Sequence, residues 1–279
     1  MRDPKEATVL VTGATDGLGK HVALQLAERG ATVLLHGRSK DRCEAVLEEL
    51  RTQTGTEGIR YYLADLSSLN AVRGLAEQIL SEPERLDVLV NNAGIISSER
   101  EESEDGLELT FAVNYQAHFL LTNLLLPLLQ NSAPARIINV ASAGQSPVDF
   151  RDVMLERGYD GMRAYAQSKL AQIIFTLDLA ERLRDTGVTA NALHPATLMD
   201  TKMVFETFGR ASSSVCEGAD ATVRLAISPQ LEWVTGRYFD GTREAGANRQ
   251  AYDTEARKRL WDLSEELCGR LLEPFPVNV

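Results

Sequence analysis

Short apolar runs alternate with longer amphipathic segments along most of the chain. Runs rich in Val, Ile and Leu predict strands at 8–12, 32–36, 59–63, 86–91, 136–142, 188–194 and 236–239. Segments between them, such as 19–29, 40–52 and 69–80, carry apolar residues every three or four positions, which predicts amphipathic helices. Strands that alternate with helices form a parallel sheet covered on both faces. We therefore expect one α/β domain over residues 1–279, built on a single doubly wound, Rossmann-type parallel sheet.

One segment interrupts this alternation after the sixth predicted strand. Residues 196–215 contain several large apolar side chains, namely Leu198, Met199, Met203, Phe205 and Phe208. Ligands of doubly wound sheets bind beyond the carboxyl ends of the strands, where this segment begins. We expect an inserted lid over an apolar substrate pocket. A surface helix that buries these side chains fits the pattern equally well.

The composition is that of a globular protein, with 279 residues, of which 44% are hydrophobic and 25% charged. The 29 basic and 40 acidic side chains give a net charge of −11, which disfavours nucleic acid as a partner. Much of the excess lies in residues 99–108, where six carboxylates and Arg100 sum to −5. Such charge runs are typical of a solvated loop.

The apolar segments are too short to predict a membrane span. The longest, 119–129, is interrupted by Thr122, Asn123 and Pro127 and falls short of the roughly 20 residues a span needs. The first residues lack the pattern of a signal peptide, so we expect a cytoplasmic protein. The three scattered cysteines predict buried thiols, and the four histidines show no metal-ligand spacing, so no metal site is expected.

A glycine-rich loop follows the first predicted strand and leads into a helix. Gly13 permits a tight turn, Gly17 allows a diphosphate to approach the backbone, and Gly19 allows the helix to pack near the strand. The free N–H groups at the start of that helix attract an anion. This loop predicts a nucleotide site.

The second predicted strand ends in His36-Gly37-Arg38. A cofactor with free ribose hydroxyls favours a carboxylate at this point, but here Gly37 takes that place and Arg38 follows. Residues 38–42 carry a local charge of +2, which suits a 2′-phosphate. We therefore expect NADP(H) to be preferred, with NAD(H) still usable. The alternative is that Arg38 is a solvated residue at a helix start.

Tyr165 and Lys169 lie four residues apart in an amphipathic segment, so a helix places them on one face. A cation near a tyrosine favours the phenolate and lowers the pKa, which suits acid–base chemistry near neutral pH. Ser142, at the end of the fifth predicted strand, offers a hydroxyl that can hold a substrate oxygen.

These patterns together resemble the short-chain dehydrogenase/reductase family over nearly the whole chain. The matching motifs are Thr12-Gly13-x-x-x-Gly17-x-Gly19, Asp65-Leu66, Asn91-Asn92-Ala93-Gly94, Asn114, Ser142, and Tyr165 with Lys169. Within the family, residues 165–183 and 187–195 most resemble the retinol-dehydrogenase-like and related bacterial carbonyl-reducing branch.

The resemblance implies a role for each matching residue. Tyr165 would transfer the proton, Ser142 would position the carbonyl, and Asn114 would hold a water of the proton relay. Lys169 would hold the nicotinamide ribose and lower the pKa of Tyr165. The implied cofactor contacts also include Gly13, Thr15, Gly17, Leu18, Gly19, Asp65, Leu66, Asn91, Ala93 and Gly94.

The chain departs from the family pattern at two places. Pro195-Ala196 stands where Pro-Gly is usual, and the following segment is one residue longer, so nicotinamide contacts are expected at Pro195, Leu198 and Thr201. Asp16 stands where many NADP-preferring members carry a basic residue.

We expect an NADP(H)-dependent oxidoreductase that interconverts a carbonyl and an alcohol on a small, lipophilic substrate, as a homodimer or homotetramer. Tyr165 would act as its general acid and base. A non-catalytic NADP(H)-binding scaffold or sensor is the alternative. A serine hydrolase using Ser142 and His194 is disfavoured, because Val140 occupies the first glycine position of the nucleophile elbow.

Overall fold

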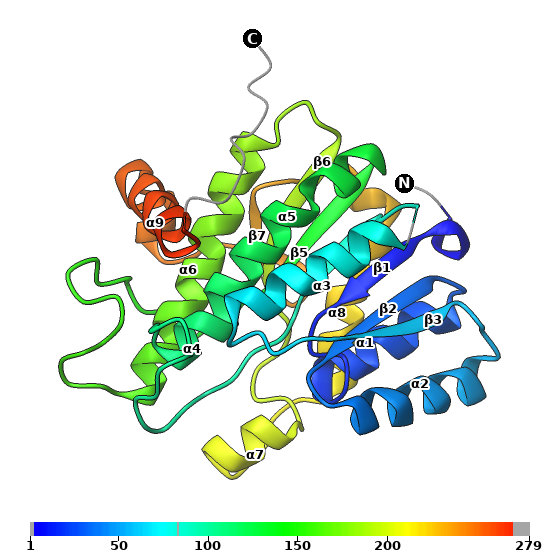
Figure 1. The fold of residues 1–279 in the computed structure, drawn as a ribbon, viewed down its shortest axis with the longest axis horizontal. Helices are drawn as coiled ribbons and strands as arrows, with labels where there is room; N and C mark the ends of the chain where they lie inside the picture. The colour runs from blue at the N-terminus through cyan, green and yellow to red at the C-terminus, as the bar shows by residue number, and fades with distance from the viewer. Residues whose placement is uncertain (1–2, 83, 270–279) are drawn as a thin grey trace.

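The computed structural model describes residues 3–82 and 84–269 and contains an eight-stranded sheet (Figure 1). The strand order is β3-β2-β1-β4-β5-β6-β7-β8, and every neighbouring pair is parallel except β7 with β8. The strands are β1 (Thr8–Val11), β2 (Thr32–Gly37), β3 (Ile59–Leu63), β4 (Val88–Asn91), β5 (Ala135–Val140), β6 (Val188–His194), β7 (Arg237–Asp240) and β8 (Arg243–Ala245). This is the predicted doubly wound α/β fold.

Helices cover both faces of the sheet (Figure 1). The α-helices are α1 (Gly17–Glu28), α2 (Lys40–Thr54), α3 (Leu69–Ser81), α4 (Leu109–Phe111), α5 (Ala117–Asn131), α6 (Gly161–Arg182), α7 (Lys202–Phe208), α8 (Val215–Ile227) and α9 (Thr254–Leu267). Short turns are η1 (Pro4–Glu6), η3 (Pro229–Leu231) and η4 (Arg249–Tyr252), and η2 (Ala112–Gln116) is a π-helical turn. Helices α1, α2 and α8 pack on one face, and α3, α5 and α6 on the other. Two apolar cores result, one on each side of the sheet.

The strand order reverses between β1 and β4. In doubly wound sheets, the carboxyl ends of the strands at such a reversal border the crevice in which ligands bind. All seven predicted strands are present, with ends shifted by up to two residues. Strand β8 was not predicted, because a three-residue edge strand carries too few side chains for an alternating pattern. Residues 1–2, 83 and 270–279 of the predicted domain lie outside the described residues.

The acidic segment 99–108 is not simply a solvated loop. Glu108 is buried and caps α4 by accepting hydrogen bonds from the backbone N–H groups of Thr110 and Phe111 at 2.9 and 2.7 Å. Asp105 accepts from the Leu69 N–H at the start of α3. Carboxylates suit helix N-termini, because the first N–H groups there lack intrahelical partners. Part of the charge run therefore fixes helices beside the sheet.

Segment 196–215 forms helix α7, which contains no buried residue. Phe205 and Phe208 are 50% and 42% exposed. A surface helix is thus present, but it does not bury these side chains as one interpretation of the sequence required. The prediction of buried thiols is likewise wrong for Cys216, which is exposed, whereas Cys43 and Cys268 are buried.

No helix within the described part of the chain is long and apolar enough to cross a membrane. The same residues contain no group of His, Cys, Asp or Glu side chains that could hold a metal ion.

Candidate active site

Two glycines of the loop between β1 and α1, Gly13 and Gly19, leave no room for a Cβ. Gly13 has a positive φ of 64°, and a Cβ there would lie 2.9 Å from the Ala93 Cα. A Cβ on Gly19 would collide with the Gly13 carbonyl oxygen. Asp16 accepts a hydrogen bond from the Gly17 N–H at 2.8 Å and caps α1. The loop is therefore a bare-backbone cradle at a helix N-terminus, which fits a diphosphate.

Two side chains to which the sequence analysis assigned no role, His36 and Asn92, hold this loop in place. His36 Nδ1 accepts from the Gly13 N–H at 3.2 Å, and its Nε2 donates to the Ala64 carbonyl oxygen at 3.1 Å. Burial lowers the pKa of His36 to about 4, so the ring is neutral at pH 7 and Nδ1 can accept. Asn92 donates to the Thr12 carbonyl oxygen at 2.8 Å. These bonds join distant segments, so no local pattern reveals them.

The end of β2 brings Arg38 to the border of the loop. Arg38 is exposed, and a Cβ on neighbouring Gly37 would lie 2.6 Å from Thr15 Cγ2, so the strand end packs tightly against the loop. Partial burial works to raise the pKa of Asp65, but hydrogen bonds from Ser67 and the charge of Arg38 outweigh it and lower the pKa. Arg38 and ionised Asp65 therefore share this corner of the crevice.

The predicted catalytic residues come from three elements at the carboxyl edge of the sheet. Ser142 follows β5, Tyr165 and Lys169 lie on α6, and Asn114 lies in the π-helical turn η2. Tyr165 and Ser142 share a hydrogen bond, and Lys169 Nζ lies 5.6 Å from the centre of the Tyr165 ring. Such turns often occur at functional sites.

Lys169 and Asn114 are held by buried hydrogen bonds. Lys169 Nζ donates to the Val140 carbonyl oxygen at 2.8 Å and to Gln172 Oε1 at 2.9 Å. The Asn114 side chain accepts from the Ile95 N–H at 2.8 Å and donates to the Ile95 carbonyl oxygen at 3.0 Å. Both side chains are therefore fixed in one orientation.

The electrostatics of the tyrosine differ from the prediction. Burial raises the pKa of Tyr165, and its hydrogen bond with Ser142 offsets the rise only in part. Burial also lowers the pKa of Lys169 to about 7, so the ammonium group is only partly charged near neutral pH. The expected net lowering of the Tyr165 pKa is therefore absent, while the contribution of Lys169 itself stays a prediction. Desolvation is the largest cause of the pKa shift of each group.

The remaining predicted cofactor residues fall into two groups. Several border the crevice: a Cβ on Gly94 would lie 3.4 Å from Asn114 Oδ1 and 3.5 Å from Lys169 Nζ, and one on Gly17 would lie 3.3 Å from Thr201 Cγ2. Leu18 and Pro195 both face Gly218 of α8, and Leu198 has a positive φ of 47°. The segment after β6 therefore crosses the glycine loop.

Two predicted contacts lie below the surface of the crevice. Asn91 is fully buried, and its amide donates to Thr122 Oγ1 at 2.9 Å and to Asn139 Oδ1 at 2.8 Å. Leu66 is packed into the core on the α3 side. The structure does not bring the side chain of Asn91 to the site, so only its backbone is available to a ligand.

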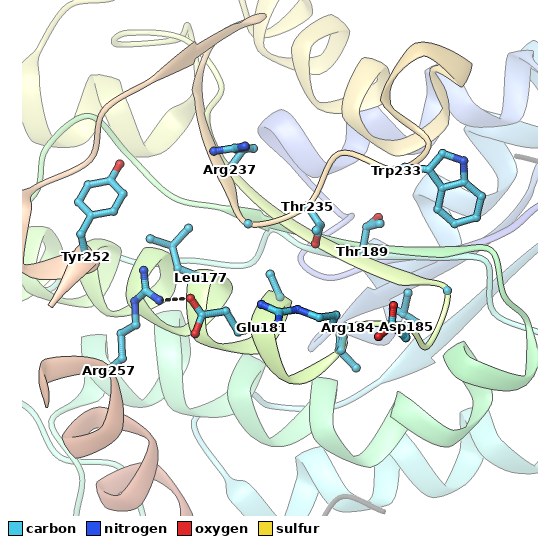
Figure 2. A pocket seen from close by; sticks show the side chains of 15 residues that line it. Leu177, Glu181, Arg184, Asp185, Thr189, Trp233, Thr235, Arg237, Tyr252 and Arg257 are labelled. Carbon is cyan, nitrogen blue, oxygen red and sulfur yellow. Dashed lines mark hydrogen bonds and ion pairs between the residues drawn. The ribbon is translucent and has the colours of Figure 1, made fainter. Parts of the chain in front are cut away.

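Two further features lie apart from this chemistry. His194 bonds Thr197 Oγ1 at 3.0 Å, and the hydrogen bonds of the described residues include none between His194 and Ser142. A groove of about 740 Å³ lies between the end of α6 and the starts of β6 and β7 (Figure 2). It is bordered by the exposed Trp233 and Tyr252 and contains none of the predicted site residues.

Comparison with known proteins matches this architecture. Residues 7–210 match the protein-family pattern described as short chain dehydrogenase. Retinol dehydrogenase 13 of Mus musculus is 41% identical over 279 residues, which cover 94% of this chain and 84% of that protein. A crystal structure of an uncharacterised protein from Mycobacterium paratuberculosis has a TM-score of 0.79 and 31% identity, covering 95% of this chain and 94% of its own. A short chain dehydrogenase from Escherichia coli CFT073 complexed with NADPH has a TM-score of 0.71 and 26% identity, covering 85% of this chain and 96% of its own.

Proposed function

This chain belongs to the short-chain dehydrogenase/reductase family of NAD(P)-dependent oxidoreductases, and we propose that it uses NADP(H) to interconvert a carbonyl and an alcohol on a small, lipophilic substrate. The observation that carries the proposal is the meeting of Ser142, Tyr165 and Lys169 at the carboxyl ends of the parallel strands, the end of the sheet at which the glycine loop follows β1. A tyrosine acid, a serine hydroxyl and a lysine at one sheet edge suit proton transfer to a substrate oxygen.

The glycine loop and the residues around it would hold the dinucleotide. The glycine loop would offer backbone N–H groups to the diphosphate, and Arg38 would offer a guanidinium group to a 2′-phosphate. Lys169 would hold a ribose hydroxyl, as the family resemblance implies. When bound, the nicotinamide donates or accepts the hydride. Preference for NADP(H) is supported by Arg38 and by the NADPH complex of the Escherichia coli relative.

The protein's own residues handle the proton. Because burial raises the pKa of Tyr165, its hydroxyl is protonated at neutral pH and ready to donate to a carbonyl oxygen. Ser142 holds the same substrate oxygen by a hydrogen bond. Lys169, whose pKa burial lowers to about 7, can release or accept a proton near neutral pH, and its Nζ lies 5.6 Å from the centre of the Tyr165 ring. Asn114 holds the backbone of Ile95 by two hydrogen bonds.

A lipophilic substrate is supported by the apolar surface near the site. Helix α7, directly after the segment that crosses the glycine loop, exposes Phe205 and Phe208. Relatives of this chain include proteins named retinol dehydrogenases. We propose that segment 196–215 is a lid over the substrate. The cytoplasmic location and the homodimer or homotetramer stay predictions from the sequence.

The direct test follows NADPH absorbance with the purified chain and a panel of aldehydes, ketones, retinoids, steroids and quinones. We expect oxidation of NADPH with at least one apolar carbonyl compound, and slower oxidation of NADH. Tight binding of NADPH without turnover on any compound would instead favour the non-catalytic scaffold.

A further inference from the structure

A buried glutamine lies one helical turn after Lys169 on α6. Gln172 is 1% exposed, and its Oε1 accepts a hydrogen bond from Lys169 Nζ at 2.9 Å. Because an ammonium group only donates hydrogen bonds, the oxygen of the Gln172 amide must face Lys169. Tyr165, Lys169 and Gln172 are separated by four and three residues, which places them on one face of the helix. The face that carries the candidate acid and the lysine therefore also carries Gln172.

The ammonium group of Lys169 has three protons, and two of them have fixed acceptors. One bonds the Val140 carbonyl oxygen at 2.8 Å, and another bonds Gln172. Gly94 also lies near Nζ: a Cβ there would be 3.5 Å away, so the absent side chain leaves space beside the ammonium group. With two protons engaged, the tetrahedral geometry of the group determines the direction of the third.

The other end of the Gln172 amide meets a second buried side chain. Its nitrogen lies 3.4 Å from His118 Nδ1. His118 Nδ1 lies 3.0 Å from the Asn114 carbonyl oxygen, and His118 Nε2 lies 3.0 Å from Thr12 Oγ1. Thr12 directly precedes the glycine loop. Gln172 is therefore part of a buried series of polar side chains that leads from the glycine loop to Lys169.

We propose that Gln172 is a positioning residue for Lys169: it anchors the ammonium group beside Gly94 and stabilises its protonated form. The inference rests on the proposed function, which gives Lys169 its role in the reaction. A buried ammonium group is costly unless it is hydrogen-bonded. Among the hydrogen bonds of the described residues, Gln172 supplies the only side-chain acceptor for Lys169.

The neighbouring titratable groups do not replace Gln172. Those that face Lys169 are Tyr165 of the same helix and His118 of α5, and the neighbour from β5 is the uncharged Val140 carbonyl oxygen. Burial lowers the pKa of His118 to about 3 and raises the pKa of Tyr165, so both are uncharged near neutral pH. Within the described part of the chain no carboxylate pairs with Lys169, whose pKa is lowered by burial.

Two substitutions separate the acceptor from the shape of the side chain. Gln172→Met keeps the length but offers only a weakly accepting thioether, whereas Gln172→Glu keeps the shape and accepts with a negative charge. Gln167→Met is the matched control. Gln167 is likewise a buried glutamine of α6, but it bonds the backbone of Asp149 and Val153 instead of Lys169.

The test is a pH titration by NMR of the full chain with isotopically labelled lysine side chains, in which the Lys169 signal is identified by its loss in Lys169→Arg. In Gln172→Met we expect the pKa of Lys169 to fall by roughly 0.5 to 1 pH unit, because the charged form loses an acceptor. In Gln172→Glu we expect it to rise by roughly 1 to 3 pH units, because an opposite charge then contacts the ammonium group. Gln167→Met should leave it unchanged.

This readout needs neither cofactor nor turnover, so it separates the two proposals. A Lys169 titration that stays unchanged in Gln172→Glu, or that moves equally in Gln167→Met, would overturn the inference even if the chain oxidises NADPH. If no carbonyl compound is turned over, the proposed function fails, while the titration still decides whether Gln172 controls the protonation of Lys169. In a chain that turns over, the pH profile of NADPH oxidation should move in the same direction as the titration in each Gln172 variant.

Discussion

Burial of Lys169 links the candidate site to the stability of the fold. The side chain is 4% exposed, and burial lowers its pKa from the usual 10.5 to about 7. Between these two values the unfolded chain binds a proton that the folded chain does not, so stability rises with pH there. Below about pH 7 both states are protonated and the cost of burying the charge is present in full.

Lys169→Met removes this titrating group while keeping a side chain of similar length. The variant loses the two hydrogen bonds of the ammonium group at every pH, so the informative quantity is the change with pH. We expect the stability of the wild type relative to the variant to rise by up to about 1.4 kcal/mol per pH unit as pH rises above 7. Urea unfolding of both proteins at about pH 7 and about pH 9 measures it. A difference that does not change with pH would show that Lys169 keeps an ordinary pKa in the folded state.

Some residues of the candidate site could be predicted from the sequence, because they lie close together along the chain, and others could not. Tyr165 with Lys169 and the three glycines could be predicted, because each set lies within a few residues of one chain segment. His36 could not be predicted, because its role comes from hydrogen bonds to residues 23 and 28 positions away. The raised pKa of Tyr165 was also unpredictable, since sequence spacing shows the nearby cation but not the desolvation.

At the scale of elements, the acidic segment 99–108 shows how a charged loop can position helices. Glu108 is 1% exposed and accepts hydrogen bonds from two N–H groups of α4 and from the Tyr159 hydroxyl at 3.1 Å. Helix α4 leads directly into η2, which carries Asn114. The cap therefore supports an element of the candidate site.

Glu108→Ala leaves buried N–H groups without an acceptor. We expect the free energy of unfolding to fall by about 2 kcal/mol, in the upper range for a lost helix cap. Glu99→Ala, at an exposed position of the same segment, should change it by no more than about 0.5 kcal/mol. Equal effects of the two substitutions in a urea titration would mean that Glu108 acts only through the charge of the loop.

Helices and strands could be predicted where their buried and exposed positions follow a regular pattern along the sequence. Strands such as β1 and β5 are buried along their whole length, and their continuous apolar runs stand out in the sequence. The exposure of helix α7 was not predictable, because its apolar residues suggest burial that the fold does not provide. The local sequence shows which side chains are apolar. Whether other elements cover them depends on the tertiary structure.

At the scale of the whole molecule, the candidate functional residues lie together at the carboxyl ends of the parallel strands, on both sides of the point where the strand order reverses. The glycine loop follows β1, Arg38 follows β2, and Ser142 follows β5. The net charge of −11 does not oppose an anionic cofactor there, because Arg38 and the free N–H groups of α1 border the crevice locally. The groove in Figure 2 lies at the starts of β6 and β7, which is the opposite end of the strands from the candidate site.

The central claim is that Tyr165 moves the proton in an NADP(H)-dependent reaction. Its most direct test is the rate of NADPH oxidation by Tyr165→Phe with an apolar carbonyl substrate, together with NADPH binding measured by fluorescence. We predict a rate at least about 100-fold below that of the wild type, with NADPH affinity preserved, because phenylalanine keeps the ring and removes the acid. A variant that turns over at close to the wild-type rate would contradict the account.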